Sequence, residues 1–198
     1  MVRPRRKKLI DNHTAALLTS FQRPRADVAE ESLKQAFEER RYADMLEEIK
    51  QTMQVGCRVR LAVHSGRPNG DLTWIKRPTP FPRCGTTTFR NLCMPIFVHE
   101  QDLRIVPFAA FASAVAHEFA HIVLESTRHP LLDSEEAVDI TAMILGFRSL
   151  GIRGNVYSYH EPNRDLVTVT AGYLNPSETR YVSRKLVGLR SWATRTQG

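Results

Sequence analysis

The spacing of hydrophobic residues changes along the first half of the chain. From Asp27 to Gln54 apolar residues recur at helical intervals among Glu, Lys and Ala, which predicts one or two helices. From Val55 to Val63 apolar and polar residues alternate, which is typical of a half-buried strand. Residues 65–71 have the composition of a turn, so Leu72–Lys76 is expected to return as a second strand.

Two further strand candidates follow a proline-rich loop at residues 78–82. They are Thr86–Arg90 and Met94–Val98. Together with the two preceding strands they predict a small, mainly antiparallel sheet between residues 55 and 98.

Helical spacing returns after Val106. Phe108–Glu125 is apolar almost all round, so this helix is expected to be central and buried. A second helix is predicted to begin at Asp133, an N-cap residue with Glu136 as its capping-box partner, and to end near Gly151.

The end of the chain predicts one more helix. Residues 152–172 indicate irregular structure or short strands, and Asn175 followed by proline begins a helix that should reach Trp192. The expected class is α+β: a small sheet packed on a helix pair, with additional helices near both termini. Residues 1–25 are expected to be a basic flexible arm, and residues 26–198 a single domain.

Composition is ordinary for a globular protein, but the charge is not even. The 198 residues are 42% hydrophobic and 25% charged, which excludes disorder over the whole length. The net charge of +7 is concentrated at the ends: residues 1–8 hold five cations and no acid. The C-terminal stretch adds Arg180, Arg184, Lys185, Arg190 and Arg195. These ends permit contact with nucleic acid, although a solvated tail and helix face explain them more simply.

Cysteine usage and hydropathy indicate a soluble cytoplasmic protein. Cys57, Cys84 and Cys93 are odd in number and lack C-x-x-C spacing, so buried free thiols are expected instead of disulfides or a zinc knuckle. No apolar stretch follows the cationic N-terminus, and no segment is expected to span a membrane.

The central helix carries the motif H-E-x-x-H, formed by His117, Glu118 and His121. Histidines at positions i and i+4 project from one helix face, so two imidazoles can reach one metal ion. Glu118 can reach a metal-bound water without itself binding the metal. A buried helix with two histidines and a carboxylate needs partners for these groups, and a metal ion supplies one.

A catalytic zinc ion needs a third protein ligand and one open position. The downstream candidates are Glu125, His129, Asp133, Glu135, Glu136 and Asp139. On the second helix Glu136 lies on the core-facing stripe, whereas Glu135 shares a polar, small-residue face with Asp139. Glu135 is therefore the predicted third ligand. Asp139, one turn later, is predicted to accept the free N–H of a ligating histidine.

These residues resemble the gluzincin, or thermolysin-like, group of zinc metallopeptidases. The resemblance joins H-E-x-x-H to E-x-x-x-D on a second helix and covers residues 108–150. It implies zinc ligation by His117, His121 and Glu135, with Glu118 as general base and Asp139 orienting a histidine. The gap from His121 to Glu135 is short for the group, so a tight helix hairpin is required.

The resemblance also implies two features of a substrate cleft. A downstream side chain should stabilise the oxyanion, and Tyr157, Tyr159 and His160 are available, with His160 taken as the candidate. An edge strand should pair with the extended substrate, which would place Phe97–His99 of the strand Met94–Val98 in the cleft.

The sequence therefore predicts a metallopeptidase with one zinc ion per chain and a protein or peptide substrate. Glu118 is expected to take the proton of the zinc-bound water and pass it to the leaving amine. Two alternatives stay open: a regulatory zinc protease associated with DNA, and a non-catalytic interaction domain stabilised by zinc.

Overall fold

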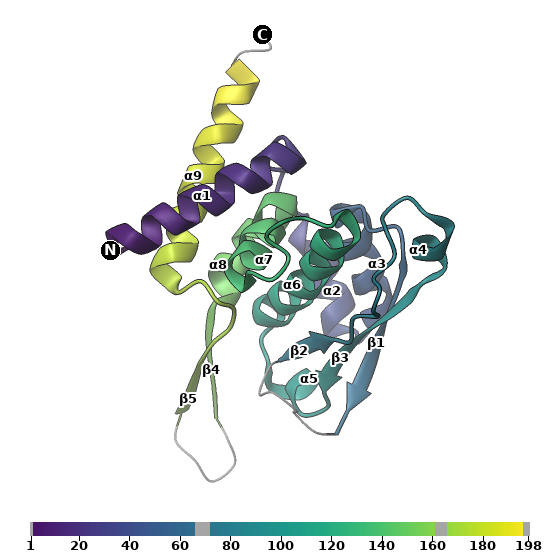
Figure 1. Cartoon of the computed structure of the whole chain (residues 1–198). Helices are drawn as coiled ribbons and strands as arrows, with labels where there is room; N and C mark the ends of the chain where they lie inside the picture. Colours follow the sequence, from purple (N-terminus) through teal and green to yellow (C-terminus); the bar gives the residue numbers. More distant parts are fainter. Residues whose placement is uncertain (1, 66–71, 161–165, 196–198) are drawn as a thin grey trace.

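The chain folds into helices around a small sheet, which confirms the α+β class (Figure 1). The computed structural model describes residues 2–65, 72–160 and 166–195. The predicted turn at residues 65–71 lies almost entirely outside the described residues.

The first sheet has three strands in the order β1-β3-β2. The strands are β1 (Arg58–His64), β2 (Thr73–Ile75) and β3 (Cys93–His99). β2 pairs antiparallel with β3, but β1 and β3 run parallel along their full lengths, from Arg58 opposite Cys93 to His64 opposite His99. The sheet is therefore mixed, and not mainly antiparallel as expected. After β2 the chain runs back to the end of the sheet where β1 begins, so that β3 starts beside the first residue of β1 and runs in the same direction.

A short helix, α4 (Thr87–Asn91), makes this return. The strand expected at Thr86–Arg90 is therefore wrong. The Thr86 hydroxyl accepts a hydrogen bond from the backbone N–H of Phe89 at 3.2 Å, and the Phe89 ring is buried. A threonine that caps a helix in this way favours a helical turn instead of an extended strand. The pattern of apolar residues alone does not reveal such a cap.

Two helices lie between Asp27 and Gln54, as the pattern predicted, and the second of them packs on β1. They are α2 (Glu30–Glu38) and α3 (Tyr42–Met53). Their buried residues are Leu33, Ala36, Met45, Leu46, Ile49 and Met53, spaced as one apolar stripe on each helix. A single turn of helix, α5 (Asp102–Ile105), follows β3.

Helix α6 (Phe108–Thr127) is the central helix, as expected. It packs on α2, α3 and β2, and its apolar residues are almost all buried. By length and composition α6 is also apolar enough to cross a membrane, contrary to the expectation of no such segment, but 67% of its most apolar stretch is buried inside the protein. The core helix of a soluble protein passes the same test.

The predicted second helix is three connected pieces: α7 (Glu135–Ala142), a π-helical turn η1 (Met143–Phe147), and α8 (Arg148–Gly154). Its N-cap is Ser134 and not Asp133, because the Ser134 hydroxyl accepts from the Ala137 N–H. The chain bends at Gly146, whose φ of 111° suits glycine.

The N-terminal segment is a helix and not a flexible arm. Helix α1 (Pro4–Phe21) buries Ile10, Thr14 and Leu17, which lie on one face, against α7 and α9. Only these three of its 18 residues are buried, and residues 5–8 are all cationic, so the composition of the segment does not indicate a packed helix. Helix α9 (Pro176–Arg195) extends past the predicted end at Trp192 and crosses α1 (Figure 1).

Between α8 and α9 lies an antiparallel hairpin of β4 (Val156–His160) and β5 (Leu166–Thr170). It confirms the short strands expected in residues 152–172. Figure 1 shows the hairpin extending from the helices beside the three-stranded sheet.

The cysteines are only partly as expected. All three are free thiols, and Cys57 is buried, which raises the pKa of its thiol to about 11. Cys84 and Cys93 are exposed instead of buried.

Close contact between α8 and α6 predicts that Gly154 tolerates no side chain. A Cβ at Gly154 would collide with the backbone of Ala109 at the start of α6. We expect Gly154→Ala to lower the free energy of unfolding by about 1–3 kcal/mol, measured by urea denaturation.

Gly188 is the matched control, because a Cβ there meets nothing within 4 Å. Gly188→Ala should leave stability unchanged or raise it by up to about 1 kcal/mol, since alanine favours helix over glycine. Equal stability of the two variants would contradict the close approach of α8 to α6.

Candidate metal centre

Helix α6 presents the motif residues towards α7. His121 is 7% exposed and Glu118 is 5% exposed, so both lie inside the protein although the helix around them is apolar. The packing of α6 on α7 brings Glu135 opposite the two histidines. The tight hairpin that the short gap required is therefore present.

The two imidazoles converge on one carboxylate oxygen. Nε2 of His117 and Nε2 of His121 each lie 3.2 Å from Oε2 of Glu135. Ligands about 2.0–2.1 Å from a tetrahedral ion are separated by about 3.3 Å, so these two separations suit ligation of one metal ion. All three ligand atoms lie within 4.8 Å of one another. Among the described residues, this is the only group of His, Cys, Asp and Glu side chains close enough to hold a metal ion.

Asp139 contacts the second ring nitrogen of His117, Nδ1. Its Oδ1 lies 2.8 Å from Nδ1 of His117, and its Oδ2 accepts the backbone N–H groups of Tyr173 at 2.7 Å and Leu174 at 2.9 Å. The carboxylate is thus fully bonded and directs Nε2 of His117 towards Glu135. A Cβ at Gly172, whose φ is 89°, would lie 3.1 Å from Asp139 Oδ2, so this loop approaches closely because residue 172 is glycine.

Electrostatics favour a cation where these atoms meet. Burial alone lowers the pKa of His117, but the hydrogen bonds to Asp139 and Glu135 outweigh burial and raise that pKa to about 10. Hydrogen bonds from His117 and His121 hold the pKa of Glu135 well below its usual range. A metal ion can replace the proton between these groups, since ligating imidazoles must be unprotonated on the ligating nitrogen.

Glu118 lies in the same pocket but outside the group of converging ligand atoms. Burial raises the pKa of its carboxyl group. The hydroxyl of Thr73 on β2 donates a hydrogen bond to Oε1 of Glu118 at 3.1 Å. This contact fixes the orientation of the Glu118 carboxylate from the side of β2.

The pocket has a volume of about 470 Å³ and lies between two β structures. Its walls are Leu72–Ile75, which include β2, and Val169–Tyr173, which include the end of β5, with α6 between them. The edge strand beside the site is therefore β2. The expectation that Phe97–His99 would line the pocket is wrong, because β3 is the central strand and β2 separates it from the site.

Among the candidates for oxyanion stabilisation, Tyr157 is buried and lines the pocket, whereas Tyr159 does not. His160 is the last residue of β4, and its side chain lies outside the described residues. Sequence reasoning missed Tyr173, whose ring stacks on His117 with centroids 5.6 Å apart. The sequence feature that could have indicated Tyr173 is its place after Gly172 in the short loop before the helix start at Asn175.

The remaining ligand candidates do not join the group. Glu125 forms an ion pair with Arg77 at 2.8 Å, and Glu136 faces α1. The ring of His129 accepts a backbone N–H, and Asp133 is exposed.

No protein-family model, curated protein or solved structure matches this chain. The site itself contains two imidazoles, one carboxylate that meets both of them and one further carboxylate that lines the same pocket.

Asp139→Asn tests how the site orients His117. Because two backbone N–H groups need an acceptor, the amide oxygen should take the place of Oδ2, and the amide NH₂ then faces Nδ1 of His117. Nδ1 must then accept, the proton moves to Nε2, and that nitrogen cannot ligate. With zinc as the probe ion, we expect the affinity of this group for metal to fall roughly 10–100-fold in competition with a chelator. Asp133→Asn, at an exposed position, should keep wild-type affinity; equal affinities in the two variants would refute the orienting role.

Proposed function

We propose that this protein is a zinc-dependent metallopeptidase. The observation that carries the proposal is the convergence of His117, His121 and Glu135 beside a buried Glu118 that is not part of the ligand group. A purely structural zinc site usually has four protein ligands, and a catalytic one has three with an open position. Three ligands and a free carboxylate in one pocket favour catalysis.

The donor set favours zinc over the hard cations. Two imidazole nitrogens and one carboxylate oxygen suit zinc, whereas calcium and magnesium prefer oxygen ligands throughout. When bound, zinc would lower the pKa of a coordinated water and polarise the scissile carbonyl group.

Glu118 is the proposed general base. Its elevated pKa, caused by burial, suits it to take a proton from the attacking water and to pass it to the leaving amine. The Thr73 hydroxyl holds Oε1, so that the second oxygen can receive the proton. Thr73 also belongs to β2, so the strand beside the substrate and the base are positioned together.

The substrate that fits this pocket is an extended polypeptide. β2 is one of the two edge strands of its sheet among the described strands, and it lines the pocket next to Glu118. An extended segment can add to such an edge through backbone hydrogen bonds, which places a peptide bond against the metal-binding groups. Trp74 and Tyr157 would then flank its side chains.

Glu118→Gln tests the reaction directly. Wild-type protein should contain about one zinc ion per chain and cleave internally quenched peptides. The variant should retain zinc but lose hydrolysis at least about 100-fold, because glutamine cannot accept the proton. Zinc is measured by elemental analysis and cleavage by fluorescence. Glu38→Gln, on the exposed face of α2, is the matched control and should behave as wild type.

The outcomes separate the rival interpretations. His121→Ala should lose the metal as well as activity. Zinc binding without cleavage of any peptide by the wild type would favour the non-catalytic zinc domain. Full activity in Glu118→Gln would contradict the proposed base, and wild-type protein that binds no zinc would remove the proposal altogether.

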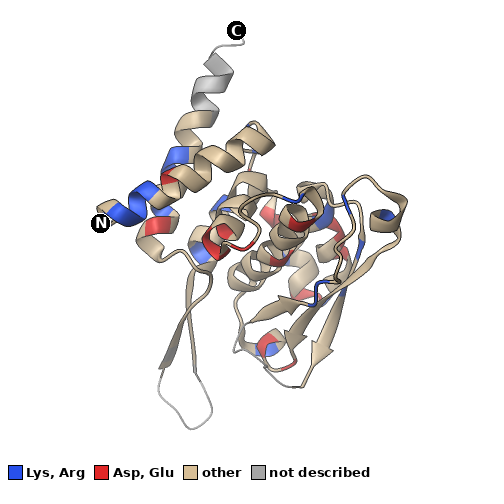
Figure 2. Cartoon of the chain, in the orientation of Figure 1, with Lys and Arg blue, Asp and Glu red and all other residues tan. Residues whose placement is uncertain are grey.

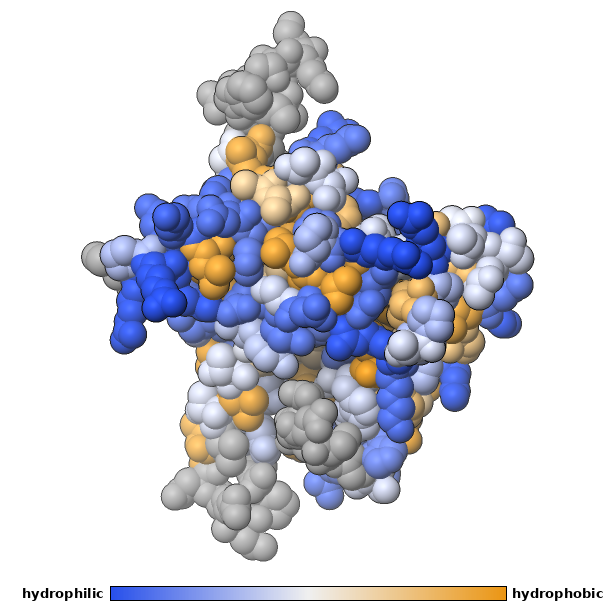
Figure 3. All heavy atoms as spheres, in the orientation of Figure 1, coloured by the Kyte–Doolittle hydropathy of each residue, from blue (hydrophilic) through white to orange (hydrophobic). Residues whose placement is uncertain are grey.

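Contact with nucleic acid is a second candidate function, favoured by the packing of α1 on α9. This packing brings together basic residues from the two ends of the chain. The exposed basic residues are Arg3 at the N-cap of α1, Arg5, Lys7 and Lys8 on α1, and Arg180 and Arg184 on α9. Figure 2 shows the positive charge on the N-terminal half of α1. In Figure 3, which has the same orientation, hydrophilic residues surround small apolar patches.

Labelled duplex DNA provides the test of this surface. We expect retardation at low salt, and binding that weakens as salt rises, because phosphate contacts release counterions. Arg5→Ala combined with Lys8→Ala should reduce the affinity and lower the salt slope by about 2. Lys34→Ala, on the exposed face of α2, is the control variant. Absence of any shift at low salt would end this candidate.

A further inference from the structure

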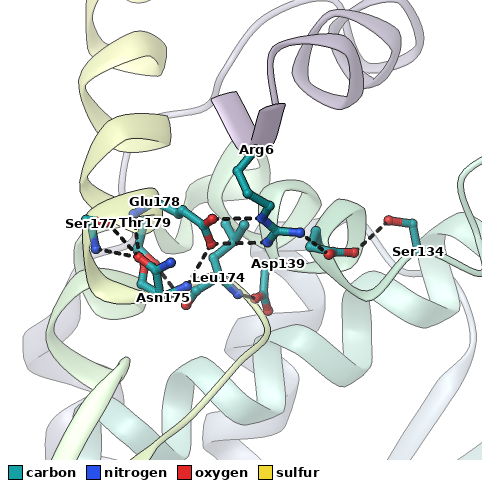
Figure 4. A network of polar contacts seen from close by, with 9 residues as sticks. Arg6, Ser134, Asp139, Leu174, Asn175, Ser177, Glu178 and Thr179 are labelled. Carbon is teal, nitrogen blue, oxygen red and sulfur yellow. Dashed lines mark hydrogen bonds and ion pairs between the residues drawn. The ribbon is translucent and has the colours of Figure 1, made fainter. Parts of the chain in front are cut away.

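Arg6 on α1 connects three helices through one side chain (Figure 4). Its Nε and Nη2 donate to the two carboxylate oxygens of Glu178 at 2.8 and 3.1 Å. Its Nη1 donates to Oε1 of Glu136 at 2.6 Å. One planar guanidinium thus joins α1 to the first turn of α7 and to the first turn of α9.

The contact with Glu136 reaches the metal-ligand helix. Glu136 directly follows Glu135, and its Oε2 accepts from the hydroxyl of Ser134, which caps α7. Arg6 therefore holds the turn of backbone from which the ligand Glu135 projects. A shift of this turn would change the distance between Glu135 and the two imidazoles.

The contact with Glu178 reaches the loop that holds Asp139. Oε2 of Glu178 accepts the backbone N–H of Asn175 at 3.1 Å. Asn175 is preceded by Tyr173 and Leu174, whose N–H groups both donate to Asp139. The same guanidinium therefore secures the loop on which the orientation of His117 depends.

The geometry at position 6 suits arginine better than lysine. The side chain of Glu178 is only 4% exposed, and that of Glu136 is 26% exposed, so both carboxylates need a partner when Arg6 is removed. A guanidinium can form a forked pair with one carboxylate and still reach a second, whereas an ammonium group acts as a point charge.

We infer that Arg6 is a positioning residue for the metal centre, and that helix α1 is a brace that keeps Glu135 and Asp139 in place. The inference rests on the proposed metal site. It adds that metal affinity depends on a residue of the N-terminal helix that does not touch the ligands.

The test compares three variants of the full chain: Arg6→Met, Arg6→Lys and Arg148→Met. Arg148 is the matched control, because it is a largely buried arginine paired with a carboxylate, Asp27, outside the metal site. Arg6→Met should bind zinc roughly tenfold more weakly than wild type in competition with a chelator, and Arg6→Lys should lie between them. Arg148→Met should lose stability to urea but keep wild-type zinc affinity.

A second readout needs no metal. In metal-free protein the proton that joins Nδ1 of His117 to Asp139 should exchange slowly with solvent in histidine-ring NMR spectra. Arg6→Met should accelerate this exchange at least severalfold, and Arg148→Met should not.

The outcomes distinguish the two proposals. Wild-type zinc affinity and slow His117 exchange in Arg6→Met would overturn the brace and leave the metal site intact. Absence of zinc binding in wild type would overturn the metal site, and the exchange measurement would still decide whether Arg6 holds Asp139 and His117 in place. Equal losses of zinc affinity in Arg6→Met and Arg148→Met would contradict the positioning role, because they would show that Arg6 acts only through the overall stability of the fold.

Discussion

The meeting of two histidine nitrogens at one oxygen of Glu135 is the constraint on which the other features of this protein depend. Burying imidazoles and the carboxylate of Glu118 beside an apolar helix is costly unless each group finds a partner. α6 supplies the histidines and Glu118, α7 supplies Glu135, and Asp139 completes the bonding of His117. Polar contacts therefore add to the apolar packing that positions the helix pair.

Around this centre the fold forms two walls with different roles. The wall of β2 contributes Thr73, which orients Glu118, and an edge that can receive an extended chain. The opposite wall, between β5 and α9, contributes the backbone N–H groups that bind Asp139 and the Tyr173 ring against His117. The proposed base is thus held from one side and the proposed ligands from the other. Arg6 extends the second set of contacts to the N-terminal helix.

Where sequence interpretation was wrong, a specific local or long-range contact explains the error. Thr86 caps a helix, so a segment with strand-like composition became α4. The parallel pairing of β1 with β3 made β3 central and removed Phe97–His99 from the pocket. The N-terminal segment is a helix because three buried positions, Ile10, Thr14 and Leu17, pack on α7 and α9, which charge composition does not indicate.

The sequence by itself determined the features that depend on helical periodicity. His117, Glu118 and His121 share one helix, and Glu135 and Asp139 another, so spacings of four residues were enough to group them. Tertiary structure alone decided which distant groups support them. Thr73 and Glu118 are 45 residues apart in the chain, and Arg6 and Glu178 are 172 apart. Such pairs carry no periodic signal, because they meet only after the helices and the sheet have packed.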